Sequence, residues 1–212
     1  MTKLYGFFRS SAAYRVRIAL NLKKVSYDHA FVHLLRGEQH KAYAKLNPQK
    51  LVPALEIDGA LLTQSLAILE YLEETRPEPP LLPKDAPGRA RVRGIALQIA
   101  CDIHPLNPPR VLNYLAAKLG ASEDARLAWY CHWIVEGLAA LETALANDAA
   151  TGEFCHGARP TLADVCLVPQ LANARRFKCA LDPYPTLRRI EAACLALPAF
   201  DAARPENQPD AE

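Results

Sequence analysis

The chain has 212 residues, half of them hydrophobic, and a formal net charge of +2 at pH 7. This length suits one large domain or two modest ones, with ample apolar residues for a packed core. The small net charge, and the absence of a basic tract interleaved with aromatic residues, argue against nucleic acid or a membrane surface as a partner. No apolar run approaches the ~20 residues of a membrane helix, and the chain opens directly into a strand pattern, so we expect a soluble, cytoplasmic protein without a signal peptide.

The first pattern is a short apolar strand at residues 4–8, followed by a turn that carries Ser10 and Ser11 and is flanked by cations. The helix that follows has apolar residues at helical spacing. A strand–turn–helix of this kind presents free backbone N–H groups and a positive dipole end, which would stabilise an anionic group or a thiolate. The alternative is an ordinary capped helix, with Ser10 or Ser11 as its N-cap.

The rest of the first 76 residues alternates strand and helix patterns. Residues 25–34 predict a second strand with Tyr27, His29, Phe31 and His33 on one face, and a short polar helix follows at residues 39–45. A later pair, Asp58-Gly59, stands between two apolar runs and predicts a hairpin, after which Gln64-Ser65 opens a helix. The resulting string β-α-β-α-β-β-α predicts a small mixed sheet with one terminal hairpin.

Two further positions in this region could contact a ligand. Pro53 stands where a strand would begin and lacks an N–H; with a cis bond, the Val52 backbone would be free to pair with an extended peptide, whereas a trans turn proline is far commoner. Gln64-Ser65 combines an amide, a hydroxyl and helix N-terminal N–H groups, which suits a carboxylate or an amino-acid head group. A plain helix cap is the alternative.

The second half of the chain shows only helical patterns. Residues 77–87 contain five prolines and predict a linker. Thr161 and Asp164 have the spacing of a capping box. Helices are predicted at residues 89–103, 110–119, 123–145, 161–176 and 185–197. We therefore expect an α/β domain at residues 1–80 and an all-helical domain at residues 88–212.

The six cysteines include no C-x-x-C pair. The chain is long and apolar enough to fold without disulfides, so we expect them to be reduced. His29 and His33 have strand spacing, and no Cys/His cluster has the spacing of a tetrahedral site, so we predict no metal.

Motifs along nearly the whole chain point to one family. They are Arg9-Ser10-Ser11, Arg15-Val16-Arg17-Ile18-Ala19-Leu20, Asn47-Pro48, Val52-Pro53, Gln64-Ser65-Leu66-Ala67-Ile68, Glu70-Tyr71-Leu72-Glu73-Glu74, Asp102-Ile103-His104-Pro105-Leu106, Thr161-Leu162-Ala163-Asp164, Leu167-Val168-Pro169-Gln170, Arg176-Phe177-Lys178 and Gln208-Pro209-Asp210. In these segments the chain resembles the zeta-class glutathione transferases, which include maleylacetoacetate and maleylpyruvate isomerases. The resemblance implies an N-terminal thioredoxin-like domain followed by a helical bundle, a homodimer, and glutathione as the cofactor.

The family reaction is a cis-to-trans isomerisation of a small dicarboxylate, a maleyl keto acid. A thiolate adds to the alkene, the new single bond rotates, and loss of the thiolate returns glutathione unchanged. Such a site needs a group that holds the thiolate and cations for the carboxylates. By resemblance, the catalytic candidates are Ser10, the first choice for the sulfur contact, with Ser11 and Arg9 on the same turn.

The resemblance also implies contacts to the rest of glutathione. The Val52 backbone would hold the cysteinyl part, and Gln64 and Ser65 the γ-glutamyl head. The full set is Ser10, Ser11, His40, Gln49, Val52, Pro53, Gln64, Ser65 and His104, with Gln49 and His40 near the glycyl carboxylate. For the substrate carboxylates the candidates are Arg9, Arg110 and Arg176, since arginine matches a carboxylate in bidentate geometry, while Arg175 is expected to be solvated.

The chain departs from the family pattern in two places. Ala12 stands where the zeta class usually has cysteine, which argues against redox chemistry by a protein thiol at this turn. Pro108 and Pro109 replace a more polar segment and have no N–H to offer a ligand.

Two other functions stay open. One is a general glutathione transferase that conjugates small electrophiles, which would want an apolar pocket rather than arginines. The other is a non-catalytic binding module on the same fold. Maleylpyruvate and maleylacetoacetate also both stay open as substrates, although Arg110 resembles its counterpart in the maleylpyruvate branch.

Overall fold

The computed structural model describes all 212 residues, which divide into two compact units. The first unit comprises residues 1–81 and 195–212, and the second comprises residues 82–194. The expected domains, 1–80 and 88–212, differ from this division at the carboxyl end of the chain. The reason is a set of hydrogen bonds from the first helix to the last residues, such as the one from Asn21 Nδ2 to the Ala199 carbonyl (3.0 Å).

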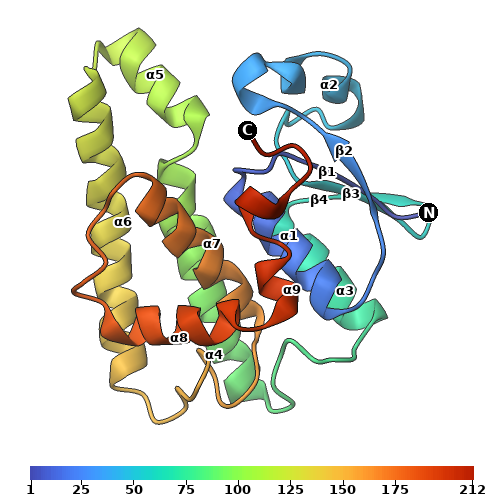
Figure 1. Cartoon of the computed structure of the whole chain (residues 1–212), viewed down its shortest axis with the longest axis vertical. Helices are drawn as coiled ribbons and strands as arrows, with labels where there is room; N and C mark the ends of the chain where they lie inside the picture. The colour runs from blue at the N-terminus through green and yellow to red at the C-terminus, as the bar shows by residue number, and fades with distance from the viewer. The chain divides into compact units, whose positions relative to one another are not determined.

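The first unit is built on a four-stranded mixed sheet in the order β2-β1-β3-β4 (Figure 1). Strand β1 is parallel to β2 and antiparallel to β3, and β3 and β4 form a hairpin, as predicted. The bounds are β1 Lys3–Gly6, β2 Asp28–Phe31, β3 Ala54–Ile57 and β4 Ala60–Thr63. At the tip of the hairpin Asp58 and Gly59 both have positive φ (52° and 79°), which is the requirement of a type I′ turn.

Helix α1 (Ser11–Leu22) is the centre of this unit. It packs against α3 (Ser65–Thr75) and against the short α9 (Pro198–Asp201), so that its residues from Ala13 to Leu20 are all buried. A helix that is buried on every side is usually apolar on every side, yet α1 also buries Arg15 and Arg17. These two cations need hydrogen-bond partners, which are described with the candidate site below.

The region between α1 and β3 is less regular than the sequence predicts. The second strand covers only Asp28–Phe31, because β2 is an edge strand whose sole partner, β1, is four residues long. Tyr27, His29 and Phe31 do share a face, with ring centroids 4.9 Å and 5.6 Å apart. The polar helix predicted at residues 39–45 is a 3₁₀ turn at Glu38–His40 followed by the one-turn α2 (Tyr43–Leu46).

The second unit is entirely helical. Its helices are α4 (Ala86–Leu97), continued by a π-helical turn at Gln98–Ile103, then α5 (Pro109–Leu119), α6 (Glu123–Ala146), α7 (Leu162–Arg176) and α8 (Pro185–Leu195). Helix α4 starts inside the predicted linker, because Asp85 caps it by accepting from the Gly88 N–H (2.7 Å) and Pro87 is tolerated in the first turn. None of the helices is both long and apolar enough to cross a lipid bilayer.

Helix α7 forms the core of the helical unit and packs against α4. Its residues from Leu162 to Leu171 are all buried. The predicted capping box at its start is confirmed: the Asp164 carboxylate accepts from the N–H (2.7 Å) and the hydroxyl (2.8 Å) of Thr161.

Candidate functional site

The turn between β1 and α1 places Ser10 at the N-cap of the helix. Its Oγ accepts a hydrogen bond from the Ala13 N–H (3.2 Å), and Ser11 begins the helix with a buried side chain. Capping uses an oxygen lone pair and leaves the hydroxyl hydrogen of Ser10 able to donate to an anion. The first turn of α1 contains no acidic residue, so no carboxylate of the helix offsets its positive end. Capping and anion binding at Ser10 are therefore compatible.

The backbone just before this turn is held on both sides. The buried Arg17 donates to the Phe8 carbonyl (3.0 Å) and to the Ala203 carbonyl (3.0 Å), while the Phe8 N–H donates to the Asp210 carboxylate (3.0 Å). Burial lowers the pKa of Arg17 to about 10, which leaves the guanidinium charged at neutral pH. The carboxyl-terminal segment thus fixes the peptide groups next to Arg9, whose guanidinium lies 4.8 Å from the centre of the Phe8 ring.

A second feature is the loop before β3. The Val52–Pro53 peptide bond is cis. The preceding carbonyl, that of Leu51, accepts from the hydroxyl of Tyr43 (2.6 Å) and from the buried amide of Asn47 (2.8 Å), which anchors the loop. Hydrogen bonds between the Val52 peptide groups and other backbone groups are absent. An extended peptide could therefore pair with Val52.

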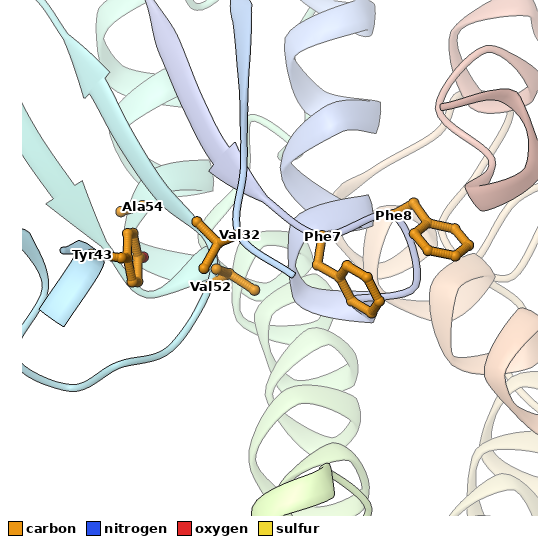
Figure 2. Close-up of a cluster of buried hydrophobic side chains, with 6 residues drawn as sticks. All are labelled: Phe7, Phe8, Val32, Tyr43, Val52 and Ala54. Carbon is orange, nitrogen blue, oxygen red and sulfur yellow. The ribbon is translucent and has the colours of Figure 1, made fainter. Parts of the chain in front are cut away.

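The Val52 side chain anchors the same loop by packing into the hydrophobic core. It is part of a buried cluster that links the loop to the β1–α1 turn and to β3. Figure 2 shows this cluster running from Tyr43 and Ala54, through Val32 and Val52, to Phe7 and Phe8. The cluster fixes the Val52 loop and the serine turn in one rigid body.

The third feature is the start of α3. Gln64 has φ 68° and ψ 116°, a conformation that costs a non-glycine residue about 1–3 kcal/mol and is concentrated at functional sites. Its side chain makes no cap; instead its Nε2 donates to Gln49 Oε1 (3.0 Å), so the structure brings these two predicted residues together. Ser65, buried at the first position of the helix, accepts from Arg15 Nη1 (3.3 Å).

Arg15 adds a charge that the sequence analysis did not assign. Only 2% of it is exposed, and its guanidinium lies behind the hydroxyl of Ser65 at a helix N-terminus. A carboxylate at this point would meet a helix dipole, a hydroxyl and a nearby cation. The signal in the sequence was the pair Arg15 and Arg17 within a largely apolar helix. The partner of Arg15, 50 residues away in the chain, could not be predicted from that pattern.

Comparison with known proteins gives a consistent answer. Residues 4–80 match the family of the glutathione S-transferase N-terminal domain, and residues 134–205 that of the C-terminal domain. A probable maleylacetoacetate isomerase of Vibrio cholerae is 55% identical over 212 residues, 98% of this chain and 97% of the relative. A holo maleylpyruvate isomerase, a bacterial zeta-class glutathione transferase, superposes with a TM-score of 0.97 at 51% identity, covering 99% of this chain and 100% of that structure. The chain belongs to the zeta class of the glutathione transferases.

A second solved structure extends the comparison to ligands. The maleylacetoacetate isomerase of Methylobacterium extorquens AM1, with bound malonate and glutathione, has a TM-score of 0.96 at 47% identity and covers 99% of each chain. These matches confirm the predicted class and fold, a thioredoxin-like domain followed by helices.

The remaining predicted site residues of this zeta-class chain lie on helix ends and turns. His40 is exposed on the 3₁₀ turn of the first unit. The other three belong to the helical unit: His104 is half-buried at the end of the π-helical turn, Arg110 is exposed in the first turn of α5, and Arg176 is exposed as the last residue of α7. The Arg176 guanidinium lies 4.7 Å from the centre of the Phe177 ring.

Arg175 is exposed, as expected, but it is not a free surface charge. Both of its terminal nitrogens donate to the carboxylate of Glu191, which is 2% exposed, and this pairing raises the pKa of Arg175. The two neighbouring arginines therefore differ sharply. Arg175 neutralises a buried charge, while the guanidinium of Arg176 lies against the Phe177 ring.

Proposed function

We propose that this chain is a glutathione-dependent cis–trans isomerase that converts a maleyl keto acid, maleylpyruvate or maleylacetoacetate, to its fumaryl isomer. One observation carries the proposal. A single small unit combines a helix whose first turn holds no acidic residue and whose N-cap is a serine, a Val52 peptide without backbone hydrogen bonds, and a second helix N-terminus backed by a buried arginine. Near-full-length relatives named as isomerases of this kind support it.

The residues of the first unit fit glutathione group by group. Ser65, the start of α3 and Arg15 suit the carboxylate of the γ-glutamyl head, with the strained Gln64 beside them. The Val52 peptide groups suit the cysteinyl backbone. Gln49, in contact with Gln64, and His40 are assigned to the glycyl end, and Pro53 and His104 complete the proposed cofactor set.

Glutathione, when bound, supplies a thiolate that adds reversibly to the alkene and is released again, so it is not consumed. The chain's own task is to keep that sulfur ionised. Ser10 would donate its hydroxyl hydrogen to the charged form, and the N-terminus of α1 would stabilise the same charge; both effects lower a thiol pKa. Ser11 is the alternative donor on this turn.

The substrate is a dianion, so cations are required where its carboxylates bind. We assign this role to Arg9, Arg110 and Arg176, with Arg9 also placed at the reacting end because it adjoins Ser10. Of the two arginines at the end of α7 we choose Arg176, because the guanidinium of Arg175 is already paired with the buried carboxylate of Glu191. We further infer that the protein is a cytoplasmic homodimer.

The decisive experiment follows both substrate and glutathione. With a maleyl keto acid and glutathione far below one equivalent, we expect many turnovers, no loss of free thiol, and no reaction when glutathione is omitted. A chlorinated aromatic electrophile, assayed in parallel, should be conjugated poorly. Stoichiometric loss of thiol would instead identify a conjugating transferase, and glutathione binding without either reaction would identify a binding module.

A further inference from the structure

Two cysteines of the helical unit meet at the carboxyl end of α7. Cys131 lies on α6 and Cys179 just beyond α7, and their sulfur atoms are 2.7 Å apart. That distance exceeds a disulfide bond by only about 0.7 Å. Both residues are free thiols. They are 48 residues apart in the chain, so the tertiary fold and not local sequence brings them together.

The segment that carries Cys179 is held in place by several contacts. The Phe177 ring stacks on Tyr130, the neighbour of Cys131, with centroids 3.7 Å apart, and the Cys179 N–H donates to the Ala174 carbonyl (3.0 Å). The Cys131 thiol is also 3.7 Å from the Phe177 carbonyl. Because these contacts fix the backbone on both sides, the sulfur atoms stay close without any covalent link.

The two thiols differ in access. Cys131 is half-buried, whereas Cys179 is 7% exposed. Burial, together with the contact to Cys131, raises the pKa of the Cys179 thiol to about 12. A small reagent would therefore reach Cys131 first, and Cys179 would act as the second, slower thiol.

We propose that Cys131 and Cys179 form a reversible dithiol–disulfide site that is oxidised by a low-molecular-weight disulfide such as glutathione disulfide. The Cys131 sulfur attacks one sulfur of glutathione disulfide, forms a mixed disulfide and releases one glutathione. Cys179 then attacks the Cys131 sulfur, the protein disulfide forms, and the second glutathione leaves. Two protein thiols are oxidised, one glutathione disulfide is reduced to two glutathiones, and the two thiol protons pass to them.

The cross-link would act on the end of α7. Phe177, whose ring lies against Arg176, stands between Cys179 and the last residues of the helix. A bond to α6 restricts this segment and with it the base of the Arg176 side chain. This consequence for the substrate rests on the proposed function, whereas the redox site itself does not.

The test treats the folded chain with glutathione disulfide, alkylates the remaining thiols and maps the peptides by mass spectrometry. We expect two of the six thiols to be lost, and a peptide joining the Cys131 and Cys179 segments that disappears on reduction. Persistence of both thiols under conditions that glutathionylate the exposed Cys101 would overturn the proposal, as would cross-links joining other pairs. This readout is independent of isomerase activity.

Single variants resolve the order of the steps. Cys179→Ser should stop at one glutathione on Cys131, Cys131→Ser should leave Cys179 unmodified, and the control Cys101→Ser should keep the cross-link. A Cys131→Ser chain that is glutathionylated at Cys179 would contradict the assigned order. The wild-type mapping needs no substitution and stands even where a variant fails to fold.

Discussion

The candidate residues of the two units differ in kind. In the first, the candidate contacts are largely backbone groups: the N-termini of α1 and α3 and the peptide of Val52. In the helical unit they are long side chains at helix ends, Arg110 and Arg176. Backbone groups are positioned as soon as the elements fold, whereas a guanidinium on a flexible stem depends on its neighbours for direction. We therefore expect substitutions in the first unit to affect chemistry, and those in the second to affect substrate affinity or stability.

The largest effect is expected at Ser10. Ser10→Ala removes a donor from the developing charge, and the loss of one such donor commonly lowers kcat about 10²- to 10³-fold. Because Ser10 is also the N-cap of α1, the same variant should lose about 1 kcal/mol of unfolding free energy. Steady-state kinetics and denaturant unfolding measure the two effects.

A glycine at the same position separates these roles. Glycine is a fair N-cap, so Ser10→Gly should cost only a few tenths of a kcal/mol in stability while losing as much activity as the alanine variant. Retained activity in Ser10→Gly, with activity abolished in Ser11→Ala, would assign the sulfur contact to Ser11 and leave capping as the role of Ser10.

The features that the sequence predicted are local. The Asp58-Gly59 turn and the Thr161–Asp164 capping box follow from residues within a few positions of one another, and both are confirmed. The supports of the candidate site were not predicted, because they join distant residues: Arg15 reaches Ser65, and Arg17 reaches Ala203. Helical periodicity predicted the helix that carries these arginines, but it contains no information about their burial or their partners.

The second largest effect is expected at Arg176. Charge-assisted hydrogen bonds contribute about 1.5–3 kcal/mol, so Arg176→Ala should raise KM for the diacid roughly 10- to 100-fold. The KM for glutathione should hardly change, because its carboxylates are assigned to other groups. Arg176→Lys is the matched control: it keeps the charge, loses the bidentate geometry and should recover only part of the affinity. Loss of glutathione affinity in Arg176→Ala would contradict the assignment to substrate.

The neighbouring arginine should behave in the opposite way. Arg175→Ala leaves the buried carboxylate of Glu191 without its partner, a loss that costs about 1–3 kcal/mol of unfolding free energy; half of the Arg175 side chain is exposed, so a larger figure is not expected. The KM for the diacid should stay near the wild-type value. Arg188→Ala, which breaks an exposed pair with Asp182, is the control and should change stability little. Equal increases in KM for the diacid from Arg175→Ala and Arg176→Ala would contradict the assignment of a structural role to Arg175 and a substrate-binding role to Arg176.

The smallest effect is expected at the hairpin of the first unit, where the charge of Asp58 contributes to stability and not to catalysis. The Asp58 carboxylate accepts from the Tyr71 hydroxyl (2.7 Å) and from Arg76 Nη2 (2.8 Å), and these hydrogen bonds lower its pKa below 3.8. Because the pKa of Asp58 is lower in the folded chain than in the unfolded chain, the ionised carboxylate stabilises the fold at any pH above the unfolded-state pKa. This contribution is lost as the pH falls through the folded-state pKa.

The variant Asp58→Asn tests this charge. Asparagine tolerates the positive φ of the turn, so the substitution removes the charge and little else. Wild type should be slightly more stable than the variant at neutral pH, and this difference should disappear in strong acid, below the lowered pKa of Asp58, and shrink in high salt. A difference that is the same at neutral pH and in strong acid would show that the Asp58 charge contributes nothing to the hairpin.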